Sequence, residues 1–259
     1  MRYNRWLFPM FFLAFMACHD ARRQVASSIV SPDSTTLSTK TDSLQTASLP
    51  AQIKSRTALY LDSLGLKNIR EADSTIVIKL MYATPDNFTG EILYSDLKEA
   101  YLHEDALQSL LLAQQRLKER HPEYRLIVYD AARPMSVQRK MWNRVKGTSK
   151  NIYVSNPAHG GGLHNYGLAV DVSIIDSNNV VLPMGTEVDY FGAEAHITQE
   201  AMLVKNGKIS PEERNNRLLL REVMKEAGFR ALNSEWWHFN RCSREDALRK
   251  YKQINKTYL

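Results

Sequence analysis

The sequence predicts an α+β fold: a single domain with a central, mainly antiparallel sheet flanked by helices. Strand-like and helix-like segments follow one another without the regular βαβ alternation that produces a parallel sheet. Residues 57–259 also have the length of one domain and are numerous enough for a proper hydrophobic core. No internal repeat is visible along the chain.

The first elements of this domain are two strands with a helix between them. The β-branched run within Ser74–Leu80 predicts a strand. In Asp105–Arg120, apolar residues recur at helical spacing, and Pro122 ends the predicted helix. Leu126–Tyr129 is then expected to form a short buried strand.

A turn and a second helix follow. The strand leads into Asp130–Pro134, where the proline favours a turn or a first helical position. Ser136–Val145 is predicted to be a helix, closed by Gly147.

The later elements are an alternating strand and a capped helix. In Leu168–Ile175, apolar residues alternate with a polar side that carries Asp171, which predicts a strand with one polar edge. Ser210 begins a capping box with a proline at the first helical position. The helix that it starts is expected to end at Gly228.

The N-terminus has the pattern of an export signal. Two arginines form a basic start, and Trp6–Ala17 is an apolar run much shorter than the ~20 residues of a spanning helix. The run ends at Ala17-Cys18 in a sequence similar to a bacterial lipoprotein cleavage box. We therefore expect residues 1–17 to be a lipoprotein-type signal peptide and Cys18 to anchor an exported, periplasmic protein to a membrane. Ordinary secretion with cleavage nearby is the alternative.

The next segment, residues 18–56, is rich in Ser and Thr and poor in large apolar residues. Because such a composition buries too little apolar surface to offset the entropy of ordering, it predicts a flexible tether. The formal net charge of the chain is +6, or +4 without the two arginines of the signal segment. No basic run with interleaved aromatic residues occurs, so the sequence gives no support for nucleic-acid binding.

The residues that carry chemistry are His164, Asp171 and His238, with Glu235 beside the last. Two imidazoles and a carboxylate can hold a divalent metal and leave one coordination position open, as in catalytic zinc sites. Glu235 then remains as a base for a metal-activated water. His164 and Asp171 would face opposite sides of a straight strand, but the glycines around His164 allow the chain to bend. Glu235 likewise needs a turn or bulge to reach the same site as His238.

Each of these residues has a simpler explanation when it is taken alone. A single histidine is more often a hydrogen-bonded or surface residue, as we expect of His159 and His196. Asp171 alone could be a buried carboxylate paired with an arginine. Cys242 lies close to His238 and could be a ligand, but a lone cysteine is more often a small buried hydrophobe. If Cys18 carries lipid, Cys242 has no intramolecular partner, which excludes a disulfide scaffold.

Several motifs together resemble one family. The pattern His164-x-x-Gly-x-Ala-x-Asp171, with Glu235-Trp-Trp-His238, is similar to that of the D-alanyl-D-alanine dipeptidase family of zinc peptidases. This family is related to bacterial DD-carboxypeptidases and to the hedgehog signalling domain. The segments 82–90, 129–134 and 184–191 resemble further motifs of the family in the expected order, so the similarity covers most of the chain from Ser74 to Phe239.

The resemblance implies a role for each matching residue. It makes His164, Asp171 and His238 the ligands of one Zn²⁺ and Glu235 the general base. Arg133 would stabilise the charge that develops on the carbonyl oxygen. Asp189 would hold the free ammonium of the dipeptide, and Tyr82 would line the pocket. One departure concerns substrate specificity: the family usually has a serine two positions before the first zinc histidine, and here that residue is Gly162.

The resemblance also implies a function and a fold. We expect a zinc-dependent D-Ala-D-Ala dipeptidase of cell-wall metabolism with a hedgehog/DD-peptidase-like fold. A DD- or LD-carboxypeptidase that acts on longer wall peptides is the nearest rival, and a non-catalytic metal-bearing binding module is another. Retention of both Glu235 and Arg133 argues against the binding module, since mere metal binding requires neither. The oligomeric state is left open.

Overall fold

Five strands form the central sheet, in the order β2-β4-β5-β7-β6, in a computed structural model that describes residues 53–257. β2 runs parallel to β4, and the three other neighbouring pairs are antiparallel. A separate antiparallel pair joins β1 and β3. The strands are β1 (Lys67–Asn68), β2 (Val77–Ile78), β3 (Tyr101–Leu102), β4 (Arg125–Asp130), β5 (Ala169–Ile175), β6 (Arg230–Leu232) and β7 (Glu235–Asn240). The expected mainly antiparallel sheet with flanking helices is therefore present.

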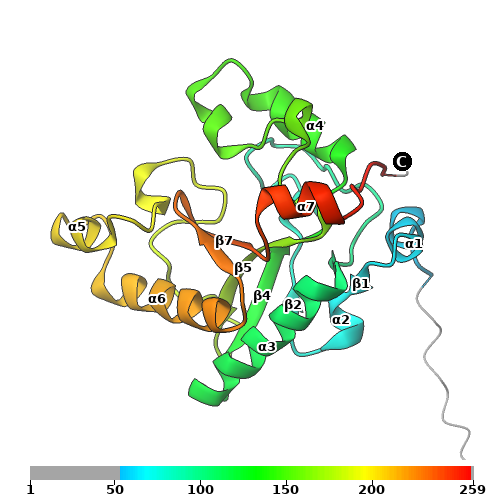
Figure 1. Cartoon of the computed structure of the whole chain (residues 1–259). Coiled ribbons are helices and arrows are strands. Elements are labelled where there is room, and N and C mark those ends of the chain that lie inside the picture. The colour runs from blue at the N-terminus through cyan, green and yellow to red at the C-terminus, as the bar shows by residue number, and fades with distance from the viewer. Residues whose placement is uncertain (1–52, 258–259) are drawn as a thin grey trace, which may run out of the picture. The chain divides into compact units, whose positions relative to one another are not determined.

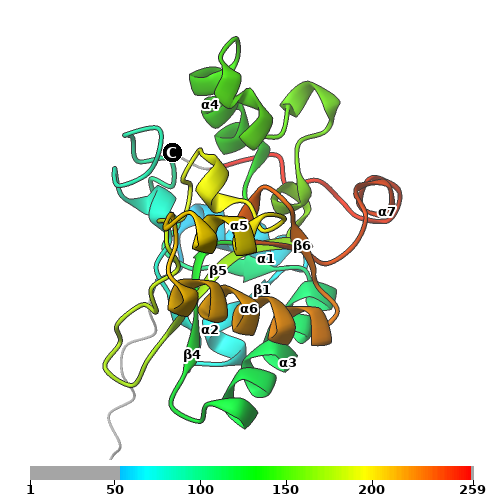
Figure 2. The ribbon, with the colours of Figure 1, turned by 90° about the vertical axis from the view of Figure 1, so that its left-hand side faces the viewer.

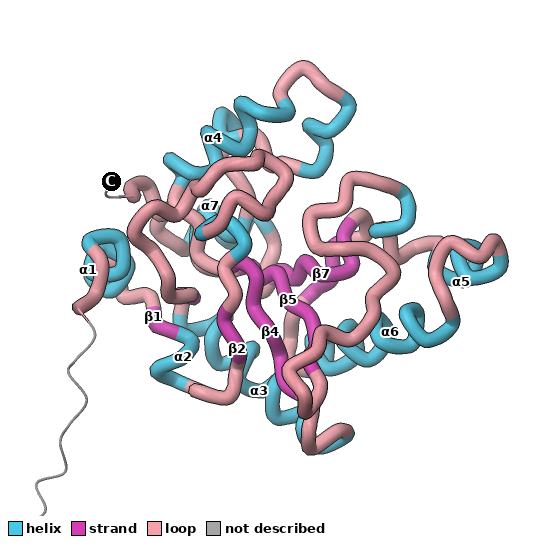
Figure 3. Tube along the Cα trace, turned by 180° about the vertical axis from the view of Figure 1, so that it is seen from behind, coloured by secondary structure: helices cyan, strands magenta, loops and turns pink. Residues whose placement is uncertain are grey.

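Two long helices, α3 and α6, pack against each other and against one face of the sheet (Figures 1 and 2). In the opposite view, no helix covers β2, β4 and β5 (Figure 3). The α-helices are α1 (Arg56–Ser63), α2 (Ile69–Ala72), α3 (Glu104–Arg120), α4 (Met135–Val145), α5 (Glu200–Lys205), α6 (Pro211–Glu226) and α7 (Arg244–Lys250). The predicted helices 105–120 and 136–145 each begin one residue earlier than expected.

The capping box predicted for α6 is present. The Ser210 side chain accepts a hydrogen bond from the Glu213 amide, and the Glu213 side chain accepts one from the Ser210 amide. These two bonds satisfy amide groups that have no partner within the helix. At the other end, Gly228 adopts a left-handed conformation with φ of +89°, as expected for a residue just after a helix.

The strand expected over Ser74–Leu80 is wrong in extent, because only Val77 and Ile78 are paired as a strand. The Asp73 carboxylate accepts hydrogen bonds from both the amide and the hydroxyl of Thr75, which holds the chain in a local turn. A 3₁₀ turn begins at Met81 and limits the other end. The β-branched composition identified the strand but not the polar side chains that shorten it.

The polar side of β5 carries Asp171 as expected, but it is not exposed to solvent. The side chains alternate as predicted, but every residue of Ala169–Ile175 is buried. The Asp171 carboxylate lies against the side chains of Arg133, His164 and His238, so it does not reach solvent. Asp171 is therefore a buried carboxylate, and it requires compensating partners.

The predicted signal peptide, the Cys18 anchor and the tether up to residue 52 lie outside the described residues. The predicted tether ends before residue 56, because Ser55 caps helix α1 and Arg56 is the first residue of that helix. Within residues 53–257, no helix combines the length and the apolar character needed to cross a membrane.

Candidate metal centre and active site

Three side chains converge at one end of β5. Asp171 lies on β5, directly opposite His238 on β7, so their side chains share one face of the sheet. His164 comes from a 3₁₀ turn, Leu163–Tyr166, that immediately precedes β5. One ligand-type atom from each residue lies within 4.8 Å of the other two. The sequence prediction that these residues meet is thus confirmed, although their role as ligands remains a prediction.

Gly167 produces the bend that brings His164 into this group. Its φ of +67° lies in the left-handed region, where residues with a side chain are strained. A Cβ at this position would also lie 2.9 Å from the backbone nitrogen of His103. Both the conformation and the close approach therefore require glycine.

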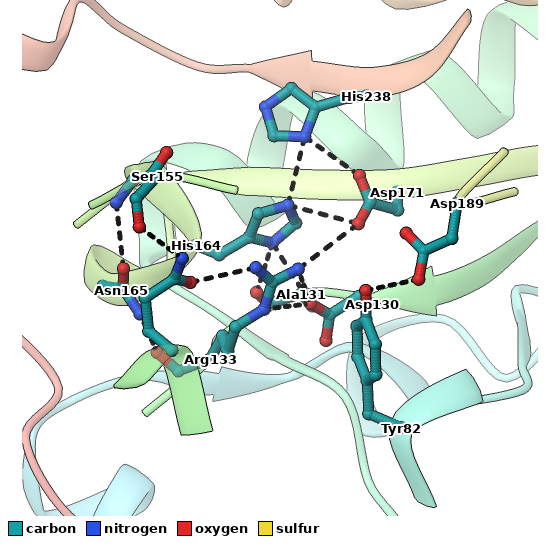
Figure 4. Close-up of polar contacts among 12 residues, drawn as sticks. Tyr82, Asp130, Ala131, Arg133, Ser155, His164, Asn165, Asp171, Asp189 and His238 are labelled. Carbon is teal, nitrogen blue, oxygen red and sulfur yellow. Dashed lines mark hydrogen bonds and ion pairs between the residues drawn. The ribbon is translucent and has the colours of Figure 1, made fainter. Parts of the chain in front are cut away.

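The outer hydrogen bonds of the two histidines leave one nitrogen of each ring facing Asp171 and the other histidine. His164 Nδ1 donates to the Ala131 carbonyl at 2.7 Å, which leaves the Nε2 lone pair facing Asp171 and His238 (Figure 4). His238 Nε2 donates to Asn240 Oδ1 at 2.9 Å, which leaves the lone pair on Nδ1. Such outer hydrogen bonds select the tautomer of a metal-binding histidine.

The distances between these atoms come close to the ligand spacing around a zinc ion, and they run to both oxygens of Asp171. Bonds of about 2.0–2.2 Å place the ligand atoms of such an ion roughly 3.3–3.6 Å apart. His164 Nε2 lies 3.2 Å from His238 Nδ1 and 3.3 Å from Asp171 Oδ2, and His238 Nδ1 lies 3.0 Å from Asp171 Oδ1. Burial alone would raise the pKa of Asp171, but His164 and His238 together hold it below its ordinary value. The donor set is therefore anionic, compact and suited to zinc.

Glu235 is a buried carboxylate beside this group. It is the first residue of β7, and its Oε2 lies 3.9 Å from His238 Nδ1. The register between β6 and β7 shifts between Ala231 and Leu232, which is the irregularity expected to aim Glu235 toward His238. Burial, reinforced by the negative charge of Asp171, raises the pKa of Glu235 to about 7. A group with this pKa can both accept and release a proton near neutral pH.

Arg133 lies beside the candidate ligands, where Asp130 neutralises its charge. Its Nε and Nη2 lie 2.8 and 2.6 Å from Asp130 Oδ2, and Nη2 lies 3.7 Å from Asp171 Oδ2. Tyr94 donates to the other oxygen of Asp130 at 2.6 Å. Burial acts to lower the pKa of Arg133, but Asp130 more than offsets this effect, so the guanidinium stays charged.

The loop that contains Arg133 is attached directly to the turn that contains His164. The Arg133 amide donates to the His164 carbonyl at 2.9 Å, and the Asn165 side chain donates to the Arg133 carbonyl at 2.8 Å. Gln138 Oε1 accepts from Arg133 Nη1 at 3.0 Å. The guanidinium is thus held in a fixed position relative to the candidate ligands.

Asp189 and Tyr82 meet on another side of the group. The Tyr82 hydroxyl donates to Asp189 Oδ2 at 2.6 Å, and the ring of Tyr82 packs against the Arg133 guanidinium (Figure 4). Asp189 has a φ of +65°, which is unusual for a residue other than glycine. Burial of the carboxyl raises the pKa of Asp189 to about 7, and the negative charge of Asp171 adds to this effect.

All seven residues singled out in the sequence line one cavity of about 460 Å³. Phe88, Tyr153 and Phe191 form an aromatic wall of this cavity, with centroid distances of 5.0 Å between neighbouring rings. Cys242 also lines the cavity and packs against the hydrophobic core, as expected of a small hydrophobe, although it is only partly buried. It does not belong to the group of candidate ligands.

Sequence reasoning did not assign a role to Asp130, Tyr94 or Gln138. The one available signal was an acidic residue three positions before Arg133 in the predicted turn. The other two partners come from separate segments, and no local pattern links them to the arginine.

Comparison with known proteins gives a consistent result. A family model described as D-Ala-D-Ala dipeptidase matches residues 62–258. The D-alanyl-D-alanine dipeptidase of Escherichia coli is 32% identical over 178 residues, which cover 69% of this chain and 85% of the relative. The D-alanyl-D-alanine dipeptidase of Enterococcus faecium is 28% identical over 183 residues, or 61% and 82% of the two chains. That of Synechocystis is 26% identical over 171 residues, or 54% and 68%.

Proposed function

Because the chain belongs to the D-Ala-D-Ala dipeptidase family of metallopeptidases, we propose that it hydrolyses the D-alanyl-D-alanine dipeptide with the help of one zinc ion. The observation that carries this proposal is the convergence of His164, Asp171 and His238 in a cavity that Glu235 and Arg133 also line. A binding module would need the three candidate ligands alone. The added base and cation support a hydrolase.

Each residue of the cavity has a task in this reaction. Zinc, when bound to His164, Asp171 and His238, supplies Lewis acidity and lowers the pKa of water toward about 7. Glu235 takes the proton of the attacking water and delivers it to the leaving amine. Arg133, which is permanently charged, faces the carbonyl oxygen on which negative charge develops.

Asp189 accounts for the preference for a dipeptide. Its carboxylate would pair with the free ammonium that directly precedes the scissile bond. Tyr82 holds one carboxylate oxygen, and the other is left for the ligand. Phe191, two residues after Asp189, belongs to the aromatic wall. This wall supports a substrate whose chain ends at the ammonium beside Asp189.

A panel of three substrates tests the proposal against the carboxypeptidase alternative. We expect the purified zinc enzyme to release D-alanine from D-Ala-D-Ala and to act poorly on N-acetyl-D-Ala-D-Ala and on a wall pentapeptide. Only a dipeptidase requires a free amine next to the scissile bond. Preference for the pentapeptide would overturn the dipeptidase assignment in favour of a carboxypeptidase.

We place the enzyme outside the cytoplasm, anchored by lipid on Cys18 and active in cell-wall metabolism. The basic start, the short apolar run and the Ala17-Cys18 junction support export. Globomycin, which inhibits lipoprotein signal peptidase, should cause the uncleaved precursor to accumulate. Normal processing in its presence would contradict the anchor.

A further inference from the structure

Ser155 lies against Gly162 at the wall of the cavity. A Cβ built on Gly162 would lie 2.8 Å from Ser155 Oγ and 3.3 Å from Ser155 Cβ. The backbone of Gly162 is extended, with φ of −110°, so its conformation does not require glycine. The Ser155 hydroxyl therefore occupies the space that a side chain at position 162 would fill.

The hydroxyl of Ser155 is available to a ligand. It lines the cavity, the residue is exposed, and Oγ has no hydrogen-bond partner within residues 53–257. The backbone at this position is nevertheless held in place, because the Ser155 carbonyl accepts from Gln138 Nε2 at 2.8 Å. Gln138 also accepts from Arg133, so Ser155 is tied to the same framework as the catalytic arginine.

Ser155 and Asp189 lie on opposite sides of the candidate metal ligands. In Figure 4, the His164 and Asp171 side chains stand between them. A dipeptide is a zwitterion, with its ammonium at one end and its carboxylate at the other. If the ammonium lies at Asp189 and the scissile amide lies at the ligands, the carboxylate points toward Ser155.

We propose that Ser155 is a substrate-binding residue. It supplies the hydroxyl absent at Gly162 and donates a hydrogen bond from this hydroxyl to the carboxylate of the dipeptide. This inference rests on the proposed function, since it takes its direction from the ammonium at Asp189. The hydroxyl would then come from the loop that precedes the 3₁₀ turn, and not from position 162 at the start of that turn.

The test compares the substrate with a neutral analogue. For Ser155→Ala, we expect the KM for D-Ala-D-Ala to rise about 10- to 100-fold, as for loss of a hydrogen bond to a charged group, with little change in kcat. The KM for D-alanyl-D-alaninamide, or its Ki if it is bound without cleavage, should change less than about twofold, because the amide lacks the charge. Ser149→Ala is the matched control: Ser149 is an exposed serine of the same segment that does not line the cavity.

A double variant that moves the hydroxyl from position 155 to position 162 gives a second test. In the double variant Ser155→Ala/Gly162→Ser, the new side chain enters the space that Ser155 Oγ has left, so the KM for the dipeptide should return toward the wild-type value. Zinc content and thermal stability would be measured alongside to show that every variant is folded and loaded.

The outcomes separate the two levels of the proposal. If wild-type enzyme does not hydrolyse D-Ala-D-Ala, both the proposed function and the role of Ser155 fall. If wild-type enzyme is active but Ser155→Ala keeps its KM, or raises the KM for acid and amide equally, only the role of Ser155 is overturned. A double variant that is folded and loaded but stays at the level of Ser155→Ala would also overturn it.

Discussion

His238 and Asp171 are direct cross-strand partners on the antiparallel strands β7 and β5, with His238 Nδ1 3.0 Å from Asp171 Oδ1. The sheet itself therefore fixes the relative position of two of the three candidate zinc ligands. The third, His164, depends on the 3₁₀ turn and on the left-handed conformation of Gly167. The centre thus combines a rigid part, set by strand register, with a part that one residue controls.

Replacing Gly167 should weaken zinc binding, although Gly167 is not itself a candidate ligand. Gly167→Ala introduces a strained φ, which costs about 1–3 kcal/mol, and a clash with the His103 backbone. We expect lower thermal stability and weaker zinc binding, measured by unfolding curves and by titration with a chelator. Gly147→Ala is the matched control, because Gly147 also has a positive φ but has no atom near its Cβ position. Equal effects of the two variants on zinc affinity would argue against the role of Gly167.

Variants of a candidate ligand and of the candidate base should differ in how much zinc they retain. His164→Ala is expected to lose zinc and activity together, whereas Glu235→Ala should keep zinc and lose about 10²- to 10⁴-fold in kcat. Elemental analysis of the purified variants, beside their turnover of D-Ala-D-Ala, makes the distinction. Full zinc occupancy in His164→Ala would mean that another residue is the ligand. Turnover close to wild type in Glu235→Ala would remove the base assignment.

Asp130, which pairs with Arg133, should matter more to folding than Tyr94, which donates a hydrogen bond to Asp130. Asp130→Ala leaves a buried guanidinium without its counter-charge, so we expect a loss of about 3–5 kcal/mol in the free energy of unfolding. Tyr94→Phe removes a single hydrogen bond to Asp130 and should cost only about 1 kcal/mol. Urea denaturation measures both values. A small loss for Asp130→Ala would show that Arg133 finds its compensation elsewhere.

Local sequence patterns were enough to predict the elements that a single segment determines. The apolar spacing of α3 and the Ser210 capping box predicted their helices, and alternation predicted β5. The extent of β2 was not predictable from β-branched residues, because the turn formed by Asp73 decides where the strand begins. The burial of Asp171 depends on side chains from other segments, Arg133, His164 and His238, which no pattern within β5 reveals.

The candidate site divides in the same way. His164, Asp171, His238 and Glu235 were found from their residue types and spacing, whereas Arg133, Asp189 and Tyr82 were found only through the resemblance to a family. All seven line one cavity. Asp130, Tyr94 and Ser155 were not found, since each gains its importance from a neighbour supplied by the fold. For Ser155 that neighbour is Gly162. The two residues are seven positions apart and come close only because the loop between them folds back toward the 3₁₀ turn that contains His164.

Asp189→Asn should change stability and substrate binding in opposite directions. The pKa of Asp189 is about 7 in the folded protein, against an ordinary value of 3.8, so folding favours the protonated form. Its contribution to stability is fully present below about pH 3.8 and is lost as the pH rises toward 7. Asparagine cannot ionise and avoids this loss. The metal-free variant should therefore be more stable than metal-free wild type at pH 8, and this advantage should be clearly smaller at pH 5.

The same substitution removes the negative charge that we propose for binding the substrate ammonium, so the KM of the zinc enzyme for D-Ala-D-Ala should rise. Urea denaturation with a chelator at pH 5 and pH 8 gives the stability difference, and steady-state kinetics gives the KM. Glu187→Gln, which removes an exposed carboxylate from the same loop, controls for loss of charge alone. If Asp189→Asn shows the same dependence of stability on pH as wild type, the Asp189 carboxyl is not the group that titrates. An unchanged KM would mean that the ammonium is bound elsewhere.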